Sequence, residues 1–156
     1  MQPICVLIKT MSNPISPIEQ LLEDLARQGF KRTKVRRALI AHLQFLKKPV
    51  DAANIRSQLE TEGLTVNKST IYRELEFLLA RGIIIEIHFG DGKKRYEIVG
   101  LPHHHHAVCK KCQRIEDIFL DHDLIRVEER IRKEKSFLVH THNLEFFGLC
   151  RDCSKS

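Results

Sequence analysis

The chain has 156 residues, 42% of them hydrophobic, and 26 Lys and Arg against 20 Asp and Glu give a net charge of +6. This length suits one ordinary domain or two small ones. No apolar run is long enough to cross a membrane or to form the core of a signal peptide, so we expect a cytoplasmic protein with no membrane partner. Residues 1–16 are expected to form a flexible N-terminal tail.

The positive charge is concentrated in the N-terminal part of the chain. Residues 1–100 hold 16 Lys and Arg against 11 Asp and Glu, whereas residues 101–156 hold 10 against 9. The densest stretch has eight basic residues and no acidic one: Arg27, Lys31, Arg32, Lys34, Arg36, Arg37, Lys47 and Lys48. A solvated helix face usually mixes the two signs, so this stretch favours a polyanion as the partner.

Apolar residues repeat at helical spacing in four successive segments, each bounded by a capping or helix-breaking residue. These segments lie between Ile18 and Gly29, Thr33 and Pro49, Asp51 and Gly63, and Asn67 or Ser69 and Gly82. Beyond Gly82 the apolar period changes to two, a Gly90-Asp91-Gly92 turn follows, and Arg95 to Val99 form the returning strand. Helices followed by a basic hairpin predict a winged helix-turn-helix domain over residues 17–99.

In such a domain the helix after the turn enters the major groove of DNA. Here that helix begins with Lys68 to Arg73, in which Ile71 fits the core better than a DNA contact. Tyr72 reads either as a contact to thymine or as a packing residue. Together with the basic hairpin and the basic segment upstream, the residues predicted to bind DNA are Lys31, Ser69, Thr70, Tyr72, Arg73, Lys93 and Lys94.

Two C-x-x-C pairs, Cys109/Cys112 and Cys150/Cys153, supply four thiolates, the ligand set of a tetrahedral structural zinc. The long spacer between the pairs indicates that the metal joins the start of a subdomain to its end. Two disulfides or two redox dithiols are the alternatives, but no feature of the sequence points to an oxidising compartment. Cys5 stands alone and receives no role.

Four consecutive histidines, His103 to His106, precede a predicted strand at Ala107 and Val108. Alternate residues of a strand face opposite sides, so His104 and His106 would serve one site, and His103 and His105 another. A solvated polyhistidine patch or the remnant of a tag is the alternative.

Taken together, these motifs resemble the ferric uptake regulator (Fur) superfamily of metal-dependent repressors. The resemblance covers roughly residues 18–153 and rests on Ser69 to Arg73, Tyr96-Glu97, the histidines leading into Cys109, and Gly148-Leu149-Cys150. It implies an α+β fold, with the winged-helix domain followed by an α/β dimerisation domain over residues 100–156 that the four-cysteine zinc site holds together. It also implies a homodimer that binds palindromic operators in double-stranded DNA when a divalent metal is bound.

The resemblance further implies a regulatory metal site formed by Glu97, His104, His106 and Asp117. Two carboxylates and two imidazoles suit iron(II), manganese(II) and zinc(II) about equally. Many relatives add a histidine just before the third helix, where this chain has Pro49. The candidates to replace this ligand are His42, Asp51, Glu86 and His88.

An accessory site is implied at His103, His105 and His142, where three histidines favour zinc. Relatives often have a glutamate on the following helix, at the position that aligns with Ile125. His122 or Asp123 are therefore the candidates for a fourth ligand, and His140 is expected to alternate with His142 on the last strand.

The sequence thus predicts a metal-dependent, sequence-specific DNA-binding repressor of metal-homeostasis genes that senses iron, zinc or manganese. A zinc- or peroxide-responsive regulator is the alternative within the family. A zinc hydrolase, a thiol oxidoreductase and a protein-binding adaptor are the alternatives outside it. We expect no enzyme, because four cysteines close a zinc site and the sequence has neither a His-Glu-x-x-His pattern nor a nucleophile elbow.

Overall fold

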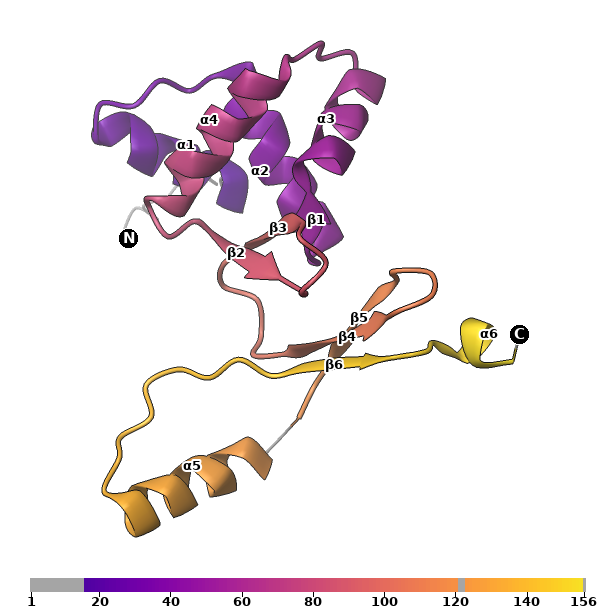
Figure 1. Cartoon of the computed structure of the whole chain (residues 1–156). Helices are drawn as coiled ribbons and strands as arrows, with labels where there is room; N and C mark the ends of the chain where they lie inside the picture. Colours follow the sequence, from indigo (N-terminus) through magenta and orange to yellow (C-terminus); the bar gives the residue numbers. More distant parts are fainter. Residues whose placement is uncertain (1–15, 121–122, 156) are drawn as a thin grey trace, which may run out of the picture.

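The computed structural model describes residues 16–120 and 123–155, so the predicted tail lies outside the described residues except for Ser16. The chain forms two three-stranded sheets, with four helices packed in the half of the first sheet; of the other two helices, one is inserted before the last strand of the second sheet and one follows that strand (Figure 1). The N-terminal elements are α1 (Pro17–Arg27), α2 (Lys34–Leu46), β1 (Val50–Asp51), α3 (Ala52–Thr61), α4 (Lys68–Leu79), β2 (Ile84–His88) and β3 (Lys94–Ile98). The C-terminal elements are β4 (His105–Cys109), β5 (Ile115–Ile118), α5 (Asp123–Lys135), β6 (Glu145–Gly148) and α6 (Arg151–Ser154).

The helix starts follow from local capping. The side chains of Ser16, Thr33, Asp51 and Asn67 each accept a hydrogen bond from the backbone N–H three residues later, at the first turns of α1, α2, α3 and α4. Such caps satisfy N–H groups that the helix itself leaves unpaired. Thr33 and Asp51 are the predicted caps, and Asn67 rather than Ser69 caps α4.

One apolar core joins the four helices to the first sheet. Leu22, Leu39, Ile55, Leu59 and Ile71 are fully buried in it, with further members from α4 and the two longer strands. These residues are the inward positions of the 3.6-residue repeat, so the periodicity of the sequence determines which helix faces meet.

In the first sheet β3 is central, paired antiparallel with β1 and β2, and the β2–β3 hairpin is the wing. The Ile84 side chain of β2 lies in the core and is 1% exposed, whereas Ile85 on the opposite face is 46% exposed. The pairing places Glu97 of β3 opposite Ile85, one residue before the sheet ends.

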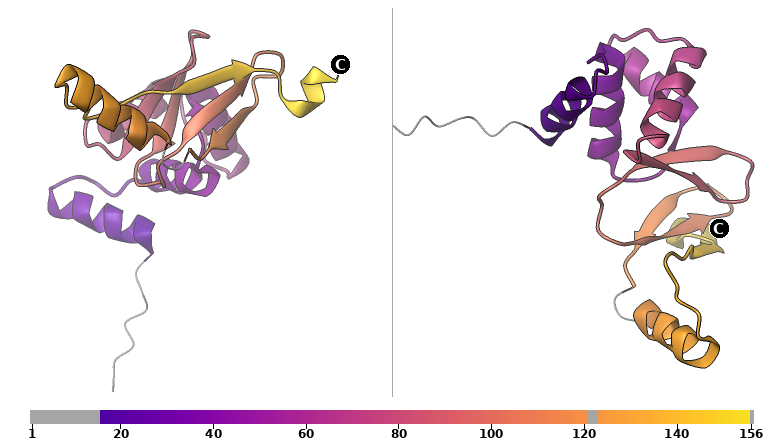
Figure 2. Two further views of the ribbon diagram at one scale, coloured as in Figure 1. Left: turned by 90° about the horizontal axis from the view of Figure 1, so that it is seen from below. Right: turned by 90° about the vertical axis from the view of Figure 1, so that its left-hand side faces the viewer.

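In the second sheet β4 is central, antiparallel to β5 and parallel to β6. Helix α5 stands apart from this sheet at the lower end of the molecule (Figure 1), and two further views show the same separation (Figure 2). Large apolar side chains of this half are exposed, namely Phe119, Ile125, Val127, Phe137, Leu138, Phe146, Phe147 and Leu149. The second half therefore exposes more large apolar side chains than the first, where the exposed ones are Phe45, Tyr72, Ile85 and Val99.

The α+β class with a winged-helix N-terminal half is thus confirmed. His140 and His142 do not lie on the last strand as predicted; they belong to the irregular segment between α5 and β6. Among the described residues no helix is long and apolar enough to span a bilayer.

Candidate metal centres and nucleic-acid interface

The four cysteines of the two C-x-x-C pairs meet at the end of the second sheet. The parallel pairing of β4 with β6 sets Cys109 opposite Gly148, so the turn after β4 and the residues after β6 leave the sheet side by side. The four Sγ atoms of Cys109, Cys112, Cys150 and Cys153 all lie within 4.8 Å of one another. The pairs that are 38 residues or more apart in sequence are therefore joined at one point, as the spacing predicted.

The separation of the sulfurs fits a metal and not a disulfide. All four cysteines are free, and the Sγ atoms of Cys112 and Cys150 are 3.7 Å apart. A tetrahedron with Zn–S bonds of about 2.3 Å has sulfurs about 3.8 Å apart, whereas a disulfide requires about 2.0 Å. This geometry disfavours the disulfide alternative and matches the donor set of a closed zinc site.

Hydrogen bonds also prepare the cluster for a cation. The backbone N–H groups of Cys112 and Cys150 point at the Cys109 sulfur and lower the pKa of Cys109 to about 6. The Cys153 thiol shares its proton with the Cys150 sulfur, which together with burial raises the pKa of Cys153 to about 12. An ion pair of 2.9 Å between Arg114 and Asp152 links the two C-x-x-C turns outside the sulfurs. Cys109 thus favours the thiolate form, which a divalent metal would bind, whereas Cys153 keeps its proton until a metal displaces it.

A second cluster lies between the two sheets, where β3 of the first half faces β4 of the second. Ligand atoms of Glu97, His104 and His106 lie within 4.8 Å of one another. The Nε2 atoms of His104 and His106 lie 3.4 and 3.6 Å from the Glu97 carboxylate. Glu97 is only 2% exposed. The Cα partner of His106 on β5 is Asp117, whose carboxylate is 3.9 Å from His106 Nε2 and 33% exposed.

Three buried polar atoms of this second cluster lack hydrogen-bond partners. Among the described residues, Glu97 Oε1, His104 Nε2 and His106 Nε2 are buried without a hydrogen bond. Burial opposes a charged imidazole at His104, but the Pro102 carbonyl and the carboxylates of Glu97 and Asp117 outweigh it and raise the pKa of His104. Buried unpaired donors and acceptors are costly. A divalent cation would satisfy all three atoms at once.

The wing contacts this cluster directly. The buried ring of Phe89, at the wing turn, meets the His106 ring edge to face with centroids 5.5 Å apart. The Arg95 guanidinium lies 5.2 Å from the Phe89 ring centre and binds the Asp91 carboxylate of the same turn through two hydrogen bonds, of 2.9 and 2.6 Å. A change in the orientation of the His106 ring would therefore alter the packing of Phe89 in the wing turn.

None of the proposed replacements for the ligand missing at Pro49 reaches this cluster. Asp51 caps α3 by accepting from Asn54 N–H, and Glu86 and His88 pair with each other at 2.7 Å on the hairpin. His42 lies on α2 beside Phe45 and Glu62, where burial lowers its pKa. Within the part of the chain that the structure describes, the donor set is Glu97, His104 and His106, with Asp117 at its edge.

The third cluster uses the opposite face of the histidine run. Ligand nitrogens of His103, His105 and His142 lie within 4.8 Å of one another, and the Nε2 atoms of His142 and His103 are 3.2 Å apart. Burial and the neighbouring imidazoles lower the pKa of His105. The alternation of the run thus separates two clusters as the strand period predicts. His122 lies outside the described residues.

The carboxylate beside the third cluster is Glu128, which the sequence analysis missed. Its Oε1 lies 2.7 Å from His142 Nδ1, whereas Ile125, the position aligned with the relatives' glutamate, is 57% exposed. Glu128 lies about one helical turn after Ile125 on α5. The signal available in the sequence was a carboxylate on a helix between the two histidine segments.

Four of the residues predicted to bind DNA lie at the start of α4. Ser69, Tyr72 and Arg73 are exposed there, Thr70 is half-buried, and Ile71 is fully buried in the core as predicted. The Lys68 ammonium lies 5.7 Å from the Tyr72 ring centre, and a cavity of about 280 Å³ opens between α3 and α4 beside Tyr72, Lys68 and Arg56. Tyr72, 37% exposed, is therefore a partly exposed ring rather than a core residue.

The hairpin is less suited to DNA than its composition suggested. Lys93 and Lys94 are exposed, but Lys94 pairs with Glu86 at 3.1 Å, and Arg95 is 5% exposed and bound to Asp91. Figure 1 shows the β2–β3 hairpin below the helices, whereas α4 begins at the top. The structure does not bring Lys93 and Lys94 next to the start of α4. Lys31 is exposed in the α1–α2 connection, whose Phe30 ring packs on Phe77 in the second half of α4 with centroids 5.1 Å apart.

A winged helix joined to a half with three clusters of metal-ligand side chains defines a metal-binding DNA-recognition protein. The family model described as the ferric uptake regulator family matches residues 27–147. The chain belongs to this family.

Known proteins agree with this assignment. The chain is 30% identical to the peroxide operon regulator of Bacillus subtilis over 138 residues and 30% identical to the ferric uptake regulation protein of the same organism over 142 residues. Each match covers 88% of this chain and 94% of the relative. The Helicobacter pylori ferric uptake regulator, whose structure reveals three functional metal-binding sites, has the same fold with a TM-score of 0.80 and 23% identity, covering 91% of this chain and 97% of that one. These relatives are regulators, which confirms that the chain is not an enzyme.

Proposed function

We propose that the chain is a metal-dependent, sequence-specific DNA-binding repressor of metal-homeostasis genes. The observation that carries the proposal is the cluster between the two sheets, where three buried ligand atoms of Glu97, His104 and His106 lie close together but have no hydrogen-bond partner among the described residues. Because Glu97 belongs to the first sheet and both histidines to the second half, a metal held there would fix one half against the other.

The regulatory ligands we propose are Glu97, His104, His106 and Asp117, and the metal is iron(II), manganese(II) or zinc(II). A metal that binds the closed arrangement better than the open one shifts the population by no more than its differential affinity for the two. Asp117, partly exposed and 3.9 Å from His106, is the fourth ligand that we propose. A metal bound there would neutralise the buried negative charge of Glu97.

The other two clusters receive separate roles. We propose that Cys109, Cys112, Cys150 and Cys153 hold a structural zinc, supported by the sulfur spacing and the low pKa of Cys109. His103, His105 and His142 form the accessory zinc site, with Glu128 orienting His142 or joining it as a ligand.

DNA recognition is proposed at Ser69, Thr70, Tyr72 and Arg73, with phosphate contacts from Lys31 and weaker ones from Lys93 and Lys94. We keep the predicted division of the chain into a DNA-binding domain over residues 17–99 and a dimerisation domain over residues 100–156. The exposed apolar residues of α5 and β6 support a homodimer, because a monomer would leave them in water. Two DNA-binding domains related by a two-fold axis then fit a palindromic operator. We place the regulator in the cytoplasm.

A peroxide-responsive regulator is the second candidate, favoured by the likeness to the peroxide operon regulator of Bacillus subtilis. Pro49 argues against a response through histidine oxidation at that position, because its side chain has no ligand atom and it is buried. Metal sensing is the better supported of the two.

The test is operator binding by the purified protein, measured against iron(II), manganese(II) and zinc(II), with elemental analysis of the same samples. We expect tight zinc at one site per chain under all conditions and tighter operator binding with one of the added metals. Operator binding that ignores all three metals would overturn the proposal.

A further inference from the structure

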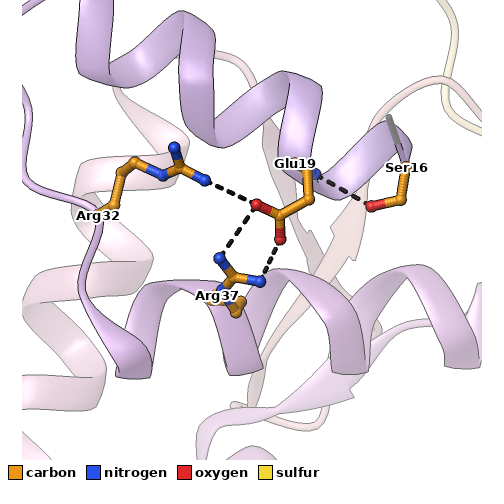
Figure 3. A network of polar contacts seen from close by, with 4 residues as sticks. All are labelled: Ser16, Glu19, Arg32 and Arg37. Atoms are coloured by element: carbon orange, nitrogen blue, oxygen red, sulfur yellow. Dashed lines mark hydrogen bonds and ion pairs between the residues drawn. The ribbon is translucent and has the colours of Figure 1, made fainter. Parts of the chain in front are cut away.

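Glu19 of α1 binds two arginines from the basic segment at once. Its carboxylate accepts from Arg32 at 2.7 Å and from both terminal nitrogens of Arg37, one of them at 3.0 Å, while its own N–H donates to the Ser16 cap (Figure 3). One negative charge therefore neutralises part of two positive charges at the corner where α1, the α1–α2 connection and the first turn of α2 meet.

These two arginines differ from their neighbour Arg36 in how they are held. The Arg36 side chain is 8% exposed and bound to Glu74 of α4 at 2.8 Å, so it belongs to the interior. Arg32 and Arg37 are 38% and 53% exposed. Exposed ion pairs add little net stability, so their exchange for another anion is inexpensive. Arginine forks also match phosphate as well as they match carboxylate.

The position of the corner indicates which anion could replace the Glu19 carboxylate. The Arg36–Glu74 pair holds the first turn of α2 against α4, and Glu74 directly follows Arg73 of the proposed DNA face. Figure 1 shows the α1–α2 connection and the start of α4 at the same end of the molecule, away from the second sheet. The first turn of α2 also presents the positive end of its helix dipole there.

Resting on the proposed DNA binding, we propose that the corner formed by Glu19, Arg32 and Arg37 is a second phosphate-binding surface, which Glu19 occupies in place of DNA phosphate. When a duplex lies along α4, the backbone phosphates flanking the groove compete with Glu19 for both guanidinium groups. Glu19 thereby lowers the affinity for DNA of any sequence, so that base contacts from α4 make a larger share of the binding.

The test is the change Glu19→Gln, with Glu23→Gln as the matched control. Glu23 lies one turn further along α1 and its loss changes the net charge equally, but no contact between it and Arg32 or Arg37 is present in the described structure. We expect Glu19→Gln to strengthen binding to random-sequence duplex roughly three- to tenfold, the combined strength of two exposed ion pairs. Glu23→Gln should change the logarithm of the affinity for random-sequence duplex by less than half as much as Glu19→Gln does.

A double-mutant cycle separates this role from a merely structural one. In an Arg32→Ala, Arg37→Ala background, Glu19→Gln should no longer strengthen binding, and the double arginine variant should lower the salt slope of log affinity by about two. Unfolding cannot imitate the expected result, because it would weaken binding. Equal effects of Glu19→Gln and Glu23→Gln, or a full gain without the arginines, would overturn the inference.

The random duplex in low salt without added metal keeps this test independent of the proposed regulation. If metal-dependent operator binding is absent but Glu19→Gln still gains affinity through the arginines, the proposed function fails and this inference stands. If metal controls operator binding but Glu19→Gln has no effect, this inference fails and the proposed function stands.

Discussion

Replacing Glu74 by Ala should strongly destabilise the N-terminal half, because it leaves the Arg36 guanidinium buried without its carboxylate. The Glu74 carboxylate accepts from Arg36 Nε at 2.8 Å and from a second guanidinium nitrogen at 3.3 Å, and the two side chains are 8% and 14% exposed. Arg36 keeps the Lys31 carbonyl at 2.7 Å and the Phe77 ring at 3.6 Å. Neither contact carries a negative charge.

The expected loss follows from that geometry. Removing one partner of a buried pair costs about 3–5 kcal/mol, and the partial exposure of Glu74 together with the remaining contacts places this case near the lower end, about 3 kcal/mol. With a urea slope of about 1–2 kcal/mol per molar for a half of this size, the unfolding midpoint should fall by roughly 1.5–3 M.

The assay is urea unfolding of the zinc-loaded protein followed by helical circular dichroism, with Glu76→Ala as the control on the exposed side of α4. A variant with Arg36→Met and Glu74→Leu should recover most of the loss, because it removes both charges together. The reasoning is refuted if Glu74→Ala costs less than about 1 kcal/mol or no more than Glu76→Ala.

Four further substitutions test other parts of the account. Cys150→Ser should abolish tightly bound zinc and destabilise the second half, measured by elemental analysis and limited proteolysis; full zinc retention would contradict the four-sulfur site. Arg73→Ala should cost about 1–3 kcal/mol on the operator and relax base discrimination, whereas Lys31→Ala should weaken all duplexes and lower the salt slope by about one; equal losses on operator and random DNA for both would contradict this division. Burial raises the pKa of Tyr96 from 10.0 to about 12 by favouring the neutral phenol, so stability that is complete below pH 10 should decline as the pH approaches 12. Tyr96→Phe should remove the tyrosinate absorbance change that occurs at about pH 12; if the change that it removes occurs near pH 10 instead, burial does not hold Tyr96 neutral.

Local signals in the sequence predicted most of the first half. Thr33 and Asp51 cap their helices because capping depends on a few neighbouring residues, and the buried Ile71 follows from helical period. The pairing of charges could not be predicted in the same way. The basic segment contains no acid, yet Glu19 and Glu74 reach it from α1 and α4, which only the packing of the helices determines.

The metal clusters also combine features that the sequence predicted with features that it did not. Strand alternation separates His103 and His105 from His104 and His106, because that period is local. The contact between Glu128 and His142 was missed. It depends on how α5 is oriented relative to the histidines, and the length of the connecting segment does not determine that orientation. No local pattern assigns Glu97 to His104 and His106 either; the resemblance to the family supplied that grouping.

The central claim is that the Glu97, His104 and His106 cluster couples metal binding to DNA binding. The most direct measurement is operator affinity with and without metal for His106→Ala and for His103→Ala, a matched change on the opposite face of the same histidine run. We expect His106→Ala to keep its structural zinc and its dimer while losing about 1–3 kcal/mol of metal-dependent affinity, the usual range of coupling between two sites. His103→Ala should lose clearly less. If His106→Ala responds to metal as the unmodified protein does, or if both variants lose the response equally, the regulatory site has been assigned to the wrong residues.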